Sequence, residues 1–404
     1  MRIALTLLSG VGYGGATYFR NLVPALAAID RTNEYHLFVP TGHALRDDIH
    51  APNIMFHEVV GPATSTVERF RYEQLTFPEE LRRHRIDLLY TAKNLAVFRA
   101  PCPQVIAIRN MEPFRYQEFE NAWMLDVRSR IKWELTKRSI TRADAIVAVS
   151  NAVRDVAVDR FPEAAGKVRV VYNGTPIISF VSLRATEGSE AIPDHERRDC
   201  RVGPMAIGPP RNDAEAPFFL TASKFVAYAN QLALVEGYAQ LVAARPDVPP
   251  LWFAGGVHDQ RYFDRVRTRV TTLGLDHRVR FLGLIPQDEL HLLMRSATAF
   301  VFPSMLESCP HTLLEAMACG VPIAASNVPP MPEICDSAAM YFTPRDPEDI
   351  ARVMARLLDD AALRGRLVAV GTERVRAFTW ERTAHGLVEA LNHVLAPRVT
   401  TSVR

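Results

Sequence analysis

The 404-residue sequence predicts an α/β protein of two domains, each built on a doubly wound parallel sheet. Three observations predict this class. The chain is longer than one ordinary domain and long enough for two. Short apolar runs alternate with amphipathic stretches in both halves, which is the pattern of βαβ units. Between the halves, residues 184–216 carry many Pro, Gly and charged residues without an apolar period.

The expected strands form two series, whose length and branching are typical of strands buried on both faces. In the first half they are Arg2–Leu8, Tyr35–Val39, Ile86–Tyr90, Gln104–Ile108 and Ala145–Ser150. Helices are expected between them, for example over Thr17–Ala28 and Val127–Thr141. In the second half the strands are Phe218–Ser223, Leu251–Ala254, Val279–Leu282, Ala299–Phe302 and Pro322–Ala325.

These series set the expected domain boundaries. We expect a first domain over 1–178, a linker or insertion over 179–216, and a second domain over 217–380. A last helical stretch over 381–396 is expected to pack back on the first domain. Two βα series around a hinge predict a ligand cleft between the domains, at the carboxyl ends of the strands.

Composition narrows the class of function. With 48% hydrophobic and 23% charged residues, the chain has the composition of a globular enzyme. A formal net charge of +2 gives no reason to expect nucleic acid as a partner. The apolar run Ile3–Leu8 is too short for a secretion signal, and no run approaches the roughly 20 apolar residues of a membrane span. We therefore expect a cytoplasmic protein that is not integral to a membrane.

Cysteine and histidine spacing predicts no metal site. The five cysteines are scattered without metal-ligand spacing, which indicates reduced thiols. His57, His258 and His291 likewise have no partners at such spacing, so core or surface roles are expected.

The segment GVGYGG places Gly10, Gly12 and Gly15 in a G-x-G-x-x-G pattern between a strand and a helix. A dinucleotide site would also need an acid at the end of the second strand, but that strand ends in HLFVPTG. Two interpretations remain open. The glycines either let the backbone approach a phosphate or sugar, or they form a tight turn without a ligand.

The segment Phe300–Ser326 carries the richest chemistry. A buried strand leads into a loop with Glu307, and Ser308 is expected to cap the following helix, with Pro310 in its first turn. Gly320 is expected to end this helix. A helix that begins at the carboxyl end of a strand directs unpaired N–H groups and a partial positive charge outward, which predicts a phosphate site.

Glu307 and Glu315, with seven residues between them in FPS…E…LLEAMACGVP, resemble the E-x7-E motif of retaining glycosyltransferases of family 4. The resemblance covers nearly the whole chain and includes GYGGATYF, AIVAVSNAVRD, VYNGT, DHRVRFLGLIPQDEL and FTWERTAHGL. It implies the GT-B fold of two facing Rossmann-like domains. It also implies a nucleotide-diphosphate sugar as donor.

The resemblance assigns roles to matching positions. Glu307 would hold hydroxyls of the donor sugar, and Glu315 would hydrogen-bond the ribose. The helix that starts near Ser308 would hold the diphosphate, with the amides of Cys309, His311 and Thr312 facing sugar and phosphate. Backbone around Gly283–Leu284 would contact the base. A glycine loop at Gly14–Gly15 would close the site from the first domain.

The leaving diphosphate needs positive charge. The sequence contains no Asp-x-Asp to hold a metal, and family 4 uses fixed cations and a helix terminus instead. Lys224 matches the first cation. Ala229 stands where relatives commonly have a lysine, in Tyr228-Ala229-Asn230. Loss of such a contact typically costs about 3–4 kcal/mol of barrier.

Arg109 and Asn110 stand where relatives often place a histidine after the fourth strand. Arg109 could face the phosphates or an acidic acceptor, or it could be a salt-bridged loop residue. No histidine base is expected here. In this family the leaving phosphate is usually held to take the acceptor's proton, so no strong protein base is required.

The expected function is a retaining, metal-independent transfer of a hexose-type sugar onto a polysaccharide or glycolipid acceptor in cell-surface glycan synthesis, without a cofactor. Two alternatives stay open: a catalytically impaired relative that acts as a partner subunit, which Ala229 motivates, and a sugar-nucleotide epimerase. A basic stretch over Arg128–Arg142, with Trp123 and Trp133, could rest on an anionic membrane. Solvated helix faces with core tryptophans are the favoured interpretation of that stretch.

Overall fold

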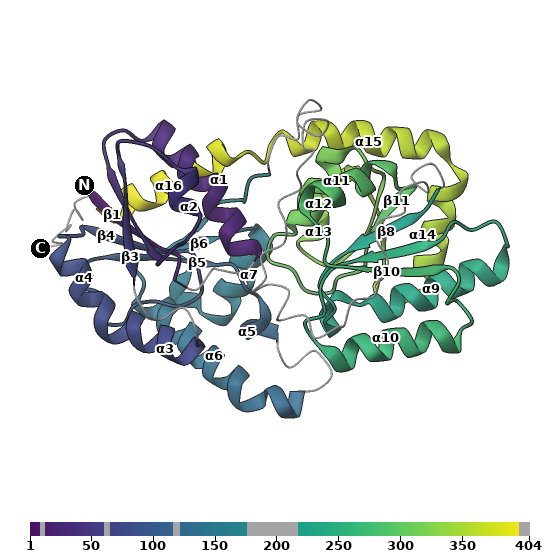
Figure 1. Ribbon diagram of the computed structural model, residues 1–404, viewed down its shortest axis with the longest axis horizontal. Helices are drawn as coiled ribbons and strands as arrows, with labels where there is room; N and C mark the ends of the chain where they lie inside the picture. The colour runs from purple at the N-terminus through teal and green to yellow at the C-terminus, as the bar shows by residue number, and fades with distance from the viewer. Residues whose placement is uncertain (9–12, 60–64, 116–121, 176–216, 396–404) are drawn as a thin grey trace, which may run out of the picture. The chain divides into compact units, whose positions relative to one another are not determined.

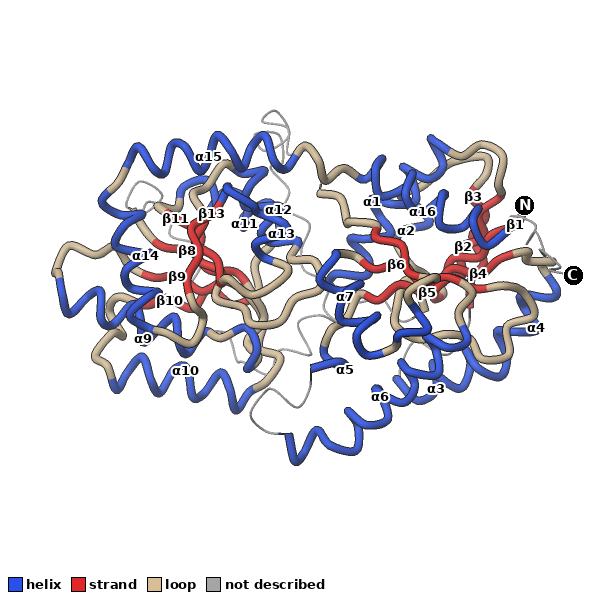
Figure 2. The backbone as a smooth tube through the Cα atoms, turned by 180° about the vertical axis from the view of Figure 1, so that it is seen from behind, coloured by secondary structure: helices blue, strands red, loops and turns tan. Residues whose placement is uncertain are grey.

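The computed structural model describes residues 1–8, 13–59, 65–115, 122–175 and 217–395. It divides into two compact units. The first unit comprises Met1–Gly174 and Thr379–Arg404, and the second comprises Thr175–Phe378. Each unit is a parallel sheet between layers of helices (Figures 1 and 2), so the predicted class is confirmed. The predicted linker over 179–216 lies outside the described residues.

The first unit contains a seven-stranded sheet of order β3-β2-β1-β4-β5-β6-β7 among its described residues. Its pairings are parallel throughout. The strands are β1 (Arg2–Thr6), β2 (Glu34–Pro40), β3 (Ile54–Val59), β4 (Leu88–Thr91), β5 (Gln104–Ile108), β6 (Ala145–Ala148) and β7 (Val168–Val170). The strand order reverses between β1 and β4, which makes this position the switch point of the sheet.

Helices cover both faces of this sheet. They are α1 (Tyr13–Ile29), α2 (Leu45–Asp48), α3 (Thr66–Arg71), α4 (Phe77–Arg83), α5 (Glu112–Arg115), α6 (Ala122–Arg142), α7 (Asn151–Arg160) and α16 (Trp380–Leu395). One face packs against α1 and α16, and the other against α4 (Figure 1). Successive side chains of a strand point to opposite faces of the sheet. Ile3 and Leu5 of β1 therefore pack in the core with α1 and α16, and Ala4 packs in the core with α4.

The second unit contains a six-stranded sheet of order β10-β9-β8-β11-β12-β13 among its described residues. The strands are β8 (Phe219–Ala222), β9 (Leu251–Ala254), β10 (Val279–Gly283), β11 (Ala299–Phe302), β12 (Ile323–Ser326) and β13 (Ala339–Phe342). The helices are α9 (Gln231–Ala244), α10 (Gln260–Thr272), α11 (Gln287–Ser296), α12 (His311–Cys319), α13 (Met331–Cys335), α14 (Pro347–Asp359) and α15 (Ala361–Val375). Helices α9, α10 and α14 share one apolar core with the strands.

Three strands were not expected from the sequence: β3, β7 and β13. Each is the edge strand of its sheet. Strand β3 is mostly half-buried, β7 is only three residues long, and the two middle residues of β13 are half-buried. Polar residues interrupt the apolar run in β3 (IMFHEV) and β7 (VRV), so the pattern that found the central strands does not detect these two, whereas β13 (AMYF) is apolar throughout and could have been predicted from its sequence.

The last helix, α16, packs on the first unit beside α1. Gly174, in the VYNGT segment, makes the approach possible. A Cβ atom on Gly174 would lie 2.4 Å from the backbone nitrogen of Trp380, closer than any side chain tolerates. Thr383 Oγ1 also donates a 2.9 Å hydrogen bond to Tyr172 O. Helix α16 is therefore fixed to the segment that follows β7.

Candidate functional site

The second unit has its own switch point, between the central strands β8 and β11. From β8 the chain builds outward through β9 and β10, and from β11 it builds the other way through β12 and β13. Ligands of doubly wound sheets bind beyond the carboxyl ends of the strands at such a point. Lys224 follows β8 there, and Ser304 and Glu307 follow β11.

Glu307 is held by the loop that carries it. Ser304 Oγ donates a 2.9 Å hydrogen bond to Glu307 Oε1, and Ser326 Oγ donates to Ser304 O at 2.6 Å. Burial raises the pKa of Glu307 to about 7, although the Ser304 hydrogen bond and the charge of Lys224 both act to lower it. The structure therefore brings Lys224 and Glu307 together. Sequence reasoning missed the role of Ser304, although Ser304 stands inside the quoted FPS segment.

Helix α12 begins at His311, so the expected cap at Ser308 is wrong. The residue at the N-cap is Pro310, which has extended backbone angles and makes no side-chain cap hydrogen bond. The reason is the proline itself, because the residue before a proline is disfavoured in the helical region and Cys309 cannot start the helix. The predicted end is confirmed at Gly320, which has φ 72°.

The start of α12 keeps the character of an anion site. The amides of Leu313 and Leu314 turn back to Pro310 O, at 3.0 and 3.4 Å. The amides of His311 and Thr312 lie at the start of the helix, the end that carries the partial positive charge. Ser308 and Cys309 lie in the preceding loop, where Ser308 is half-buried and Cys309 is buried.

Glu315 lies in the second turn of α12, where Gln287 Nε2 donates a 2.7 Å hydrogen bond to its Oε1 atom. Gln287 is the first residue of α11, and sequence reasoning did not identify it. Burial raises the pKa of Glu315 to about 7, while the Gln287 hydrogen bond acts to lower it. Burial thus raises the pKa of both acids of the pair to about 7.

Gly283 ends β10 with φ 67°, and Leu284 follows it. Gly283 O accepts a 2.7 Å hydrogen bond from the Gly255 amide. A Cβ atom on Gly255, which has φ 138°, would lie 2.1 Å from Ser223 O. The ends of β8, β9 and β10 are thus joined by backbone contacts that need glycine at 255.

Lys224 is exposed, and its Nζ atom lies 5.4 Å from the ring centroid of Tyr228. The buried Gln231 fixes the loop, since its Nε2 atom donates to Ser223 Oγ at 2.9 Å and to Lys224 O at 3.1 Å. The lysine head group is therefore accessible while the backbone beneath it is held in place.

Residues 228–230 are bound to the loop after β11. Tyr228 O accepts a 2.7 Å hydrogen bond from the Met305 amide. Asn230 has φ 61°, and its Nδ2 atom donates to Pro303 O at 3.1 Å and to Pro344 O at 2.6 Å. Ala229 lies between these anchors and is 2% exposed. The position that resembles the second cation thus holds a buried methyl group.

Two groups of predicted site residues belong to the first unit. Gly14 and Gly15 lie in the first turn of α1, so the expected loop at these residues is wrong. The helix begins at Tyr13, four residues before the predicted start at Thr17. Gly10 and Gly12 lie outside the described residues. The Arg109 guanidinium stacks on the Tyr18 ring, 3.8 Å from the centroid, and its amide donates to Asn94 Oδ1 at 3.0 Å.

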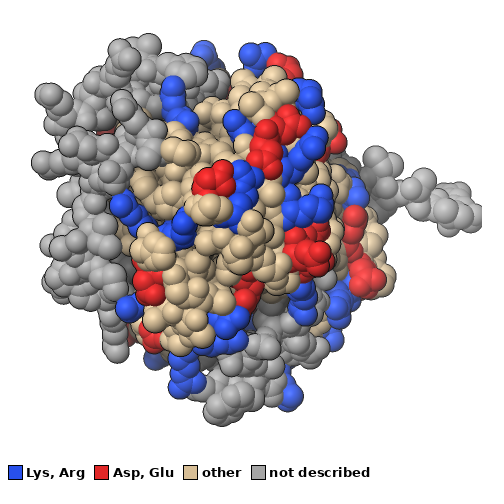
Figure 3. Space-filling view, turned by 90° about the vertical axis from the view of Figure 1, so that its right-hand side faces the viewer, with Lys and Arg blue, Asp and Glu red and all other residues tan. Residues whose placement is uncertain are grey.

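Surface features give limited support for a membrane contact. Trp133 of α6 packs against the rings of Phe114 and Phe161, at 5.9 and 5.1 Å between centroids, which favours the core interpretation for this tryptophan. The side chain of Trp123 lies outside the described residues. Among the described helices, none is long and apolar enough to cross a bilayer. On the face drawn in Figure 3, basic and acidic side chains are interspersed.

Two domains built on parallel sheets in this way make up the GT-B fold. Two family models match the chain: "Glycosyltransferase Family 4" over residues 13–177 and "Glycosyl transferases group 1" over residues 208–374. The chain therefore belongs to glycosyltransferase family 4.

A curated relative is a glycosyltransferase as well, and solved structures share the two-domain fold. The serotype-specific mannosyltransferase WbdA of Escherichia coli is 27% identical over 256 residues, which is 63% of this chain and 29% of that protein. The chain thus matches less than a third of the length of this relative. Sucrose-phosphate synthase of Thermosynechococcus elongatus has a TM-score of 0.74 at 21% identity, covering 98% of this chain and 99% of that one. HepE of Anabaena, solved in complex with UDP-glucose, has a TM-score of 0.69 at 18% identity, covering 97% and 100%.

Proposed function

We propose that the protein is a retaining, metal-independent glycosyltransferase that moves a hexose-type sugar from a nucleotide-diphosphate donor to a glycan or glycolipid acceptor. One observation carries the proposal. Lys224 and Glu307 follow adjacent strands where the sheet order reverses, and α12 starts directly after the Glu307 loop. A cation and a helix start at one switch point suit a diphosphate.

In the proposed reaction, the bond between the sugar's anomeric carbon and the diphosphate oxygen breaks, and a bond to the acceptor oxygen forms on the same face. The leaving phosphate takes the acceptor's proton. Lys224 and the amides at the start of α12 stabilise the charge that grows on the phosphate. Glu307 accepts hydrogen bonds from sugar hydroxyls, and Glu315 accepts one from the ribose. Contacts of the base with Gly283–Leu284, and of phosphate or acceptor with Arg109, remain predictions.

The names of relatives support the substrate class. WbdA and a second relative, the O-antigen chain mannosyltransferase B of Escherichia coli, which is 34% identical over 112 residues, are mannosyltransferases. HepE was solved with UDP-glucose. These names favour a hexose donor and a role in surface-glycan synthesis. A lipid-linked acceptor would bring the protein to a cytoplasmic membrane surface.

The test offers the protein a panel of UDP-, GDP- and dTDP-hexoses with candidate acceptors and measures release of nucleoside diphosphate. Glu307→Ala should lower turnover at least about 100-fold. Glu373→Ala, on the exposed face of α15, is the matched control and should leave turnover unchanged. Product anomers, assigned by NMR, should retain the donor configuration. Inversion, or full activity in Glu307→Ala, would overturn the proposal.

Ala229 favours a second candidate, a catalytically impaired relative that binds nucleotide sugar as a partner subunit. Its buried methyl group cannot stabilise a leaving phosphate. If this candidate is right, the natural chain binds nucleoside diphosphate but turns over no donor, and Ala229→Lys gains activity. If the protein is instead an active glycosyltransferase, the natural chain turns over the donor. Ala229→Lys then mainly lowers stability, because a lysine must enter a space that is 2% exposed.

A further inference from the structure

Three histidines far apart in the sequence meet on one face of the first unit. His36 lies on β2 and His57 on β3, where Phe38, two residues after His36, is paired in register with His57. His84 directly follows α4. One nitrogen from each of the three rings lies within 4.8 Å of the others. His57 has no partner at metal-ligand spacing in the sequence, and the fold supplies two.

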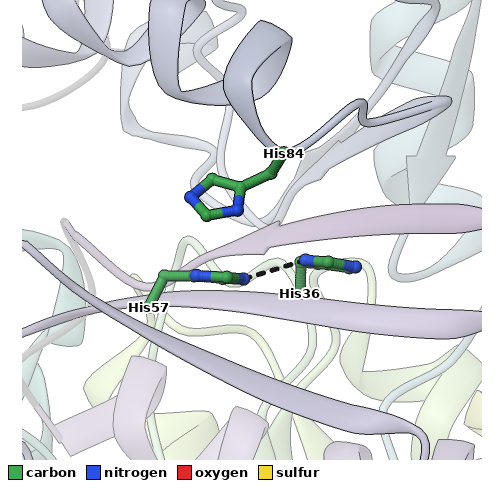
Figure 4. Close-up of side chains that lie close together, drawn as sticks. All are labelled: His36, His57 and His84. Carbon is green, nitrogen blue, oxygen red and sulfur yellow. Dashed lines mark hydrogen bonds between the residues drawn. The ribbon is translucent and has the colours of Figure 1, made fainter.

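Figure 4 shows the three rings gathered at one place. His36 Nδ1 and His57 Nε2 are hydrogen-bonded at 2.8 Å, in two rings that are nearly coplanar and lie edge to edge. The His84 ring lies over His57, with 4.0 Å between centroids. Nitrogens bound to tetrahedral Zn²⁺ at about 2.0–2.1 Å are about 3.3–3.4 Å apart. The three nitrogens lie within 4.8 Å of one another, so an ion would replace the hydrogen bond between His36 and His57 and draw the His84 ring towards them.

The surroundings suit a coordinated ion. The buried Phe38 ring forms an apolar wall, 4.8 Å from the His57 centroid and 5.8 Å from that of His84. His36 is buried, and its Nε2 atom has no hydrogen-bond partner in the described structure. His57 and His84 are half-buried, which leaves the rings accessible from outside.

A carboxylate lies near the Nε2 atom of two of the rings, those of His36 and His84. Glu34 Oε2 lies 3.8 Å from His36 Nε2, and Glu80 Oε2 lies 3.8 Å from His84 Nε2. Histidine ligands of metals usually donate their second ring N–H to such a carboxylate, which fixes the tautomer. Coordination through His36 Nδ1 would place the proton on Nε2, which faces Glu34 Oε2 at 3.8 Å.

We propose that His36, His57 and His84 bind a divalent transition-metal ion of the Zn²⁺ type. Imidazole ligands suit Zn²⁺, Co²⁺ and Ni²⁺, whereas Mg²⁺ and Ca²⁺ require oxygen ligands. Three protein ligands leave a fourth position for water. The ion would join the edge strand β3, its neighbour β2 and the end of α4. The proposal uses no donor-binding residue.

The test uses the full chain, without a polyhistidine tag and freed of metal with EDTA, in calorimetric titration with ZnCl₂. One ion per chain should bind. His57→Gln and His84→Gln should each weaken binding more than about 100-fold, because outer partners alone contribute about 10- to 100-fold. The exposed His277→Gln is the matched control and should bind as the natural chain does. Circular dichroism of each metal-free variant checks that it is folded.

Cobalt distinguishes this site from the cysteines. Co²⁺ bound by nitrogen ligands absorbs in the visible, and a thiolate ligand adds a charge-transfer band in the near ultraviolet. We expect the visible bands without the thiolate band, and their loss in His84→Gln. Excess MgCl₂ should not displace Co²⁺. The proposal is wrong if the natural chain binds no Zn²⁺, if the histidine variants bind as tightly as the natural chain, or if a thiolate band appears.

Discussion

The Ser304 hydroxyl donates a 2.9 Å hydrogen bond to Glu307 Oε1. This bond acts against burial, which raises the pKa of Glu307 to about 7, and the charge of Lys224 acts in the same direction as the bond. The ionisation of Glu307 thus depends on a neutral donor and a cation at the ends of two adjacent strands. Because the carboxylate is the form that accepts hydrogen bonds from a sugar, this balance should be visible in kinetics.

Activity should rise with pH around neutrality. We expect kcat/KM for the nucleotide sugar to increase through pH about 7 as Glu307 loses its proton. Ser304→Ala removes a hydrogen bond to the carboxylate, so it should move this rising limb of the pH profile to higher pH by about one unit. Ser296→Ala, which removes a hydroxyl that donates to Leu292 O in α11, is the control and should leave the limb in place. A profile without a limb near neutral pH would contradict this role of Glu307.

The free energy of unfolding should fall as pH rises from about 4.5 to about 7, and Glu315 contributes to this fall. Burial raises the pKa of Glu315 from 4.5 to about 7, so between these values the folded state binds a proton that the unfolded state has lost. The free energy of unfolding therefore falls as pH rises, by at most about 1.4 kcal/mol per pH unit for this group. Glu315→Gln removes the titration and keeps an oxygen for Gln287.

Urea denaturation at several pH values measures this difference. The natural chain and Glu315→Gln should differ in stability by an amount that grows from pH about 4.5 to 7 and then stays constant, because above the folded pKa both states are ionised. Glu348→Gln, in the exposed first turn of α14, should keep the natural slope. Parallel curves for the natural chain and Glu315→Gln would show that the pKa of Glu315 is not raised.

The central strands and the end of α12 could be predicted because their causes are local. A buried central strand needs a continuous apolar run, and a helix that ends in the left-handed conformation favours glycine, as at Gly320. The start of α12 was misplaced because two local rules competed. Ser308 is a good cap, but Pro310 prevents its neighbour from being helical, and the proline decided the boundary.

Contacts between distant segments could not be predicted in the same way. Gln287 and Glu315 are 28 residues apart and meet because α11 and α12 pack together. His36 and His57 meet through strand register, and His84 joins them from a helix end. No local pattern encodes such pairings, so a search for metal-ligand spacing misses them.

The approach of Gly174 to Trp380 predicts a strong effect of one methyl group on stability. A Cβ atom at 174 would lie 2.4 Å from Trp380 N, so Gly174→Ala must push α16 from its place beside α1. We expect a loss of about 3 kcal/mol in the free energy of unfolding. Gly166→Ala is the matched control, since nothing lies within 4 Å of its added Cβ atom and its change should stay within about 0.5 kcal/mol. Equal stability of the two variants would show that α16 does not dock this closely.

Metal removal should separate the two proposals. The transfer chemistry proposed here relies on Lys224 and the start of α12, whereas the proposed metal ligands His36, His57 and His84 belong to the first unit. EDTA should therefore leave the transfer rate at low temperature within about twofold, because no step passes through an ion. The same treatment should lower Tm, since an ion bound only to the folded state stabilises it by mass action, and ZnCl₂ should restore Tm. His84→Gln should have the lower Tm from the start and respond to neither reagent. If EDTA instead abolishes transfer and Mg²⁺ or Mn²⁺ restores it, the metal-independent mechanism is wrong, whereas a Tm that ignores both reagents contradicts the histidine site alone.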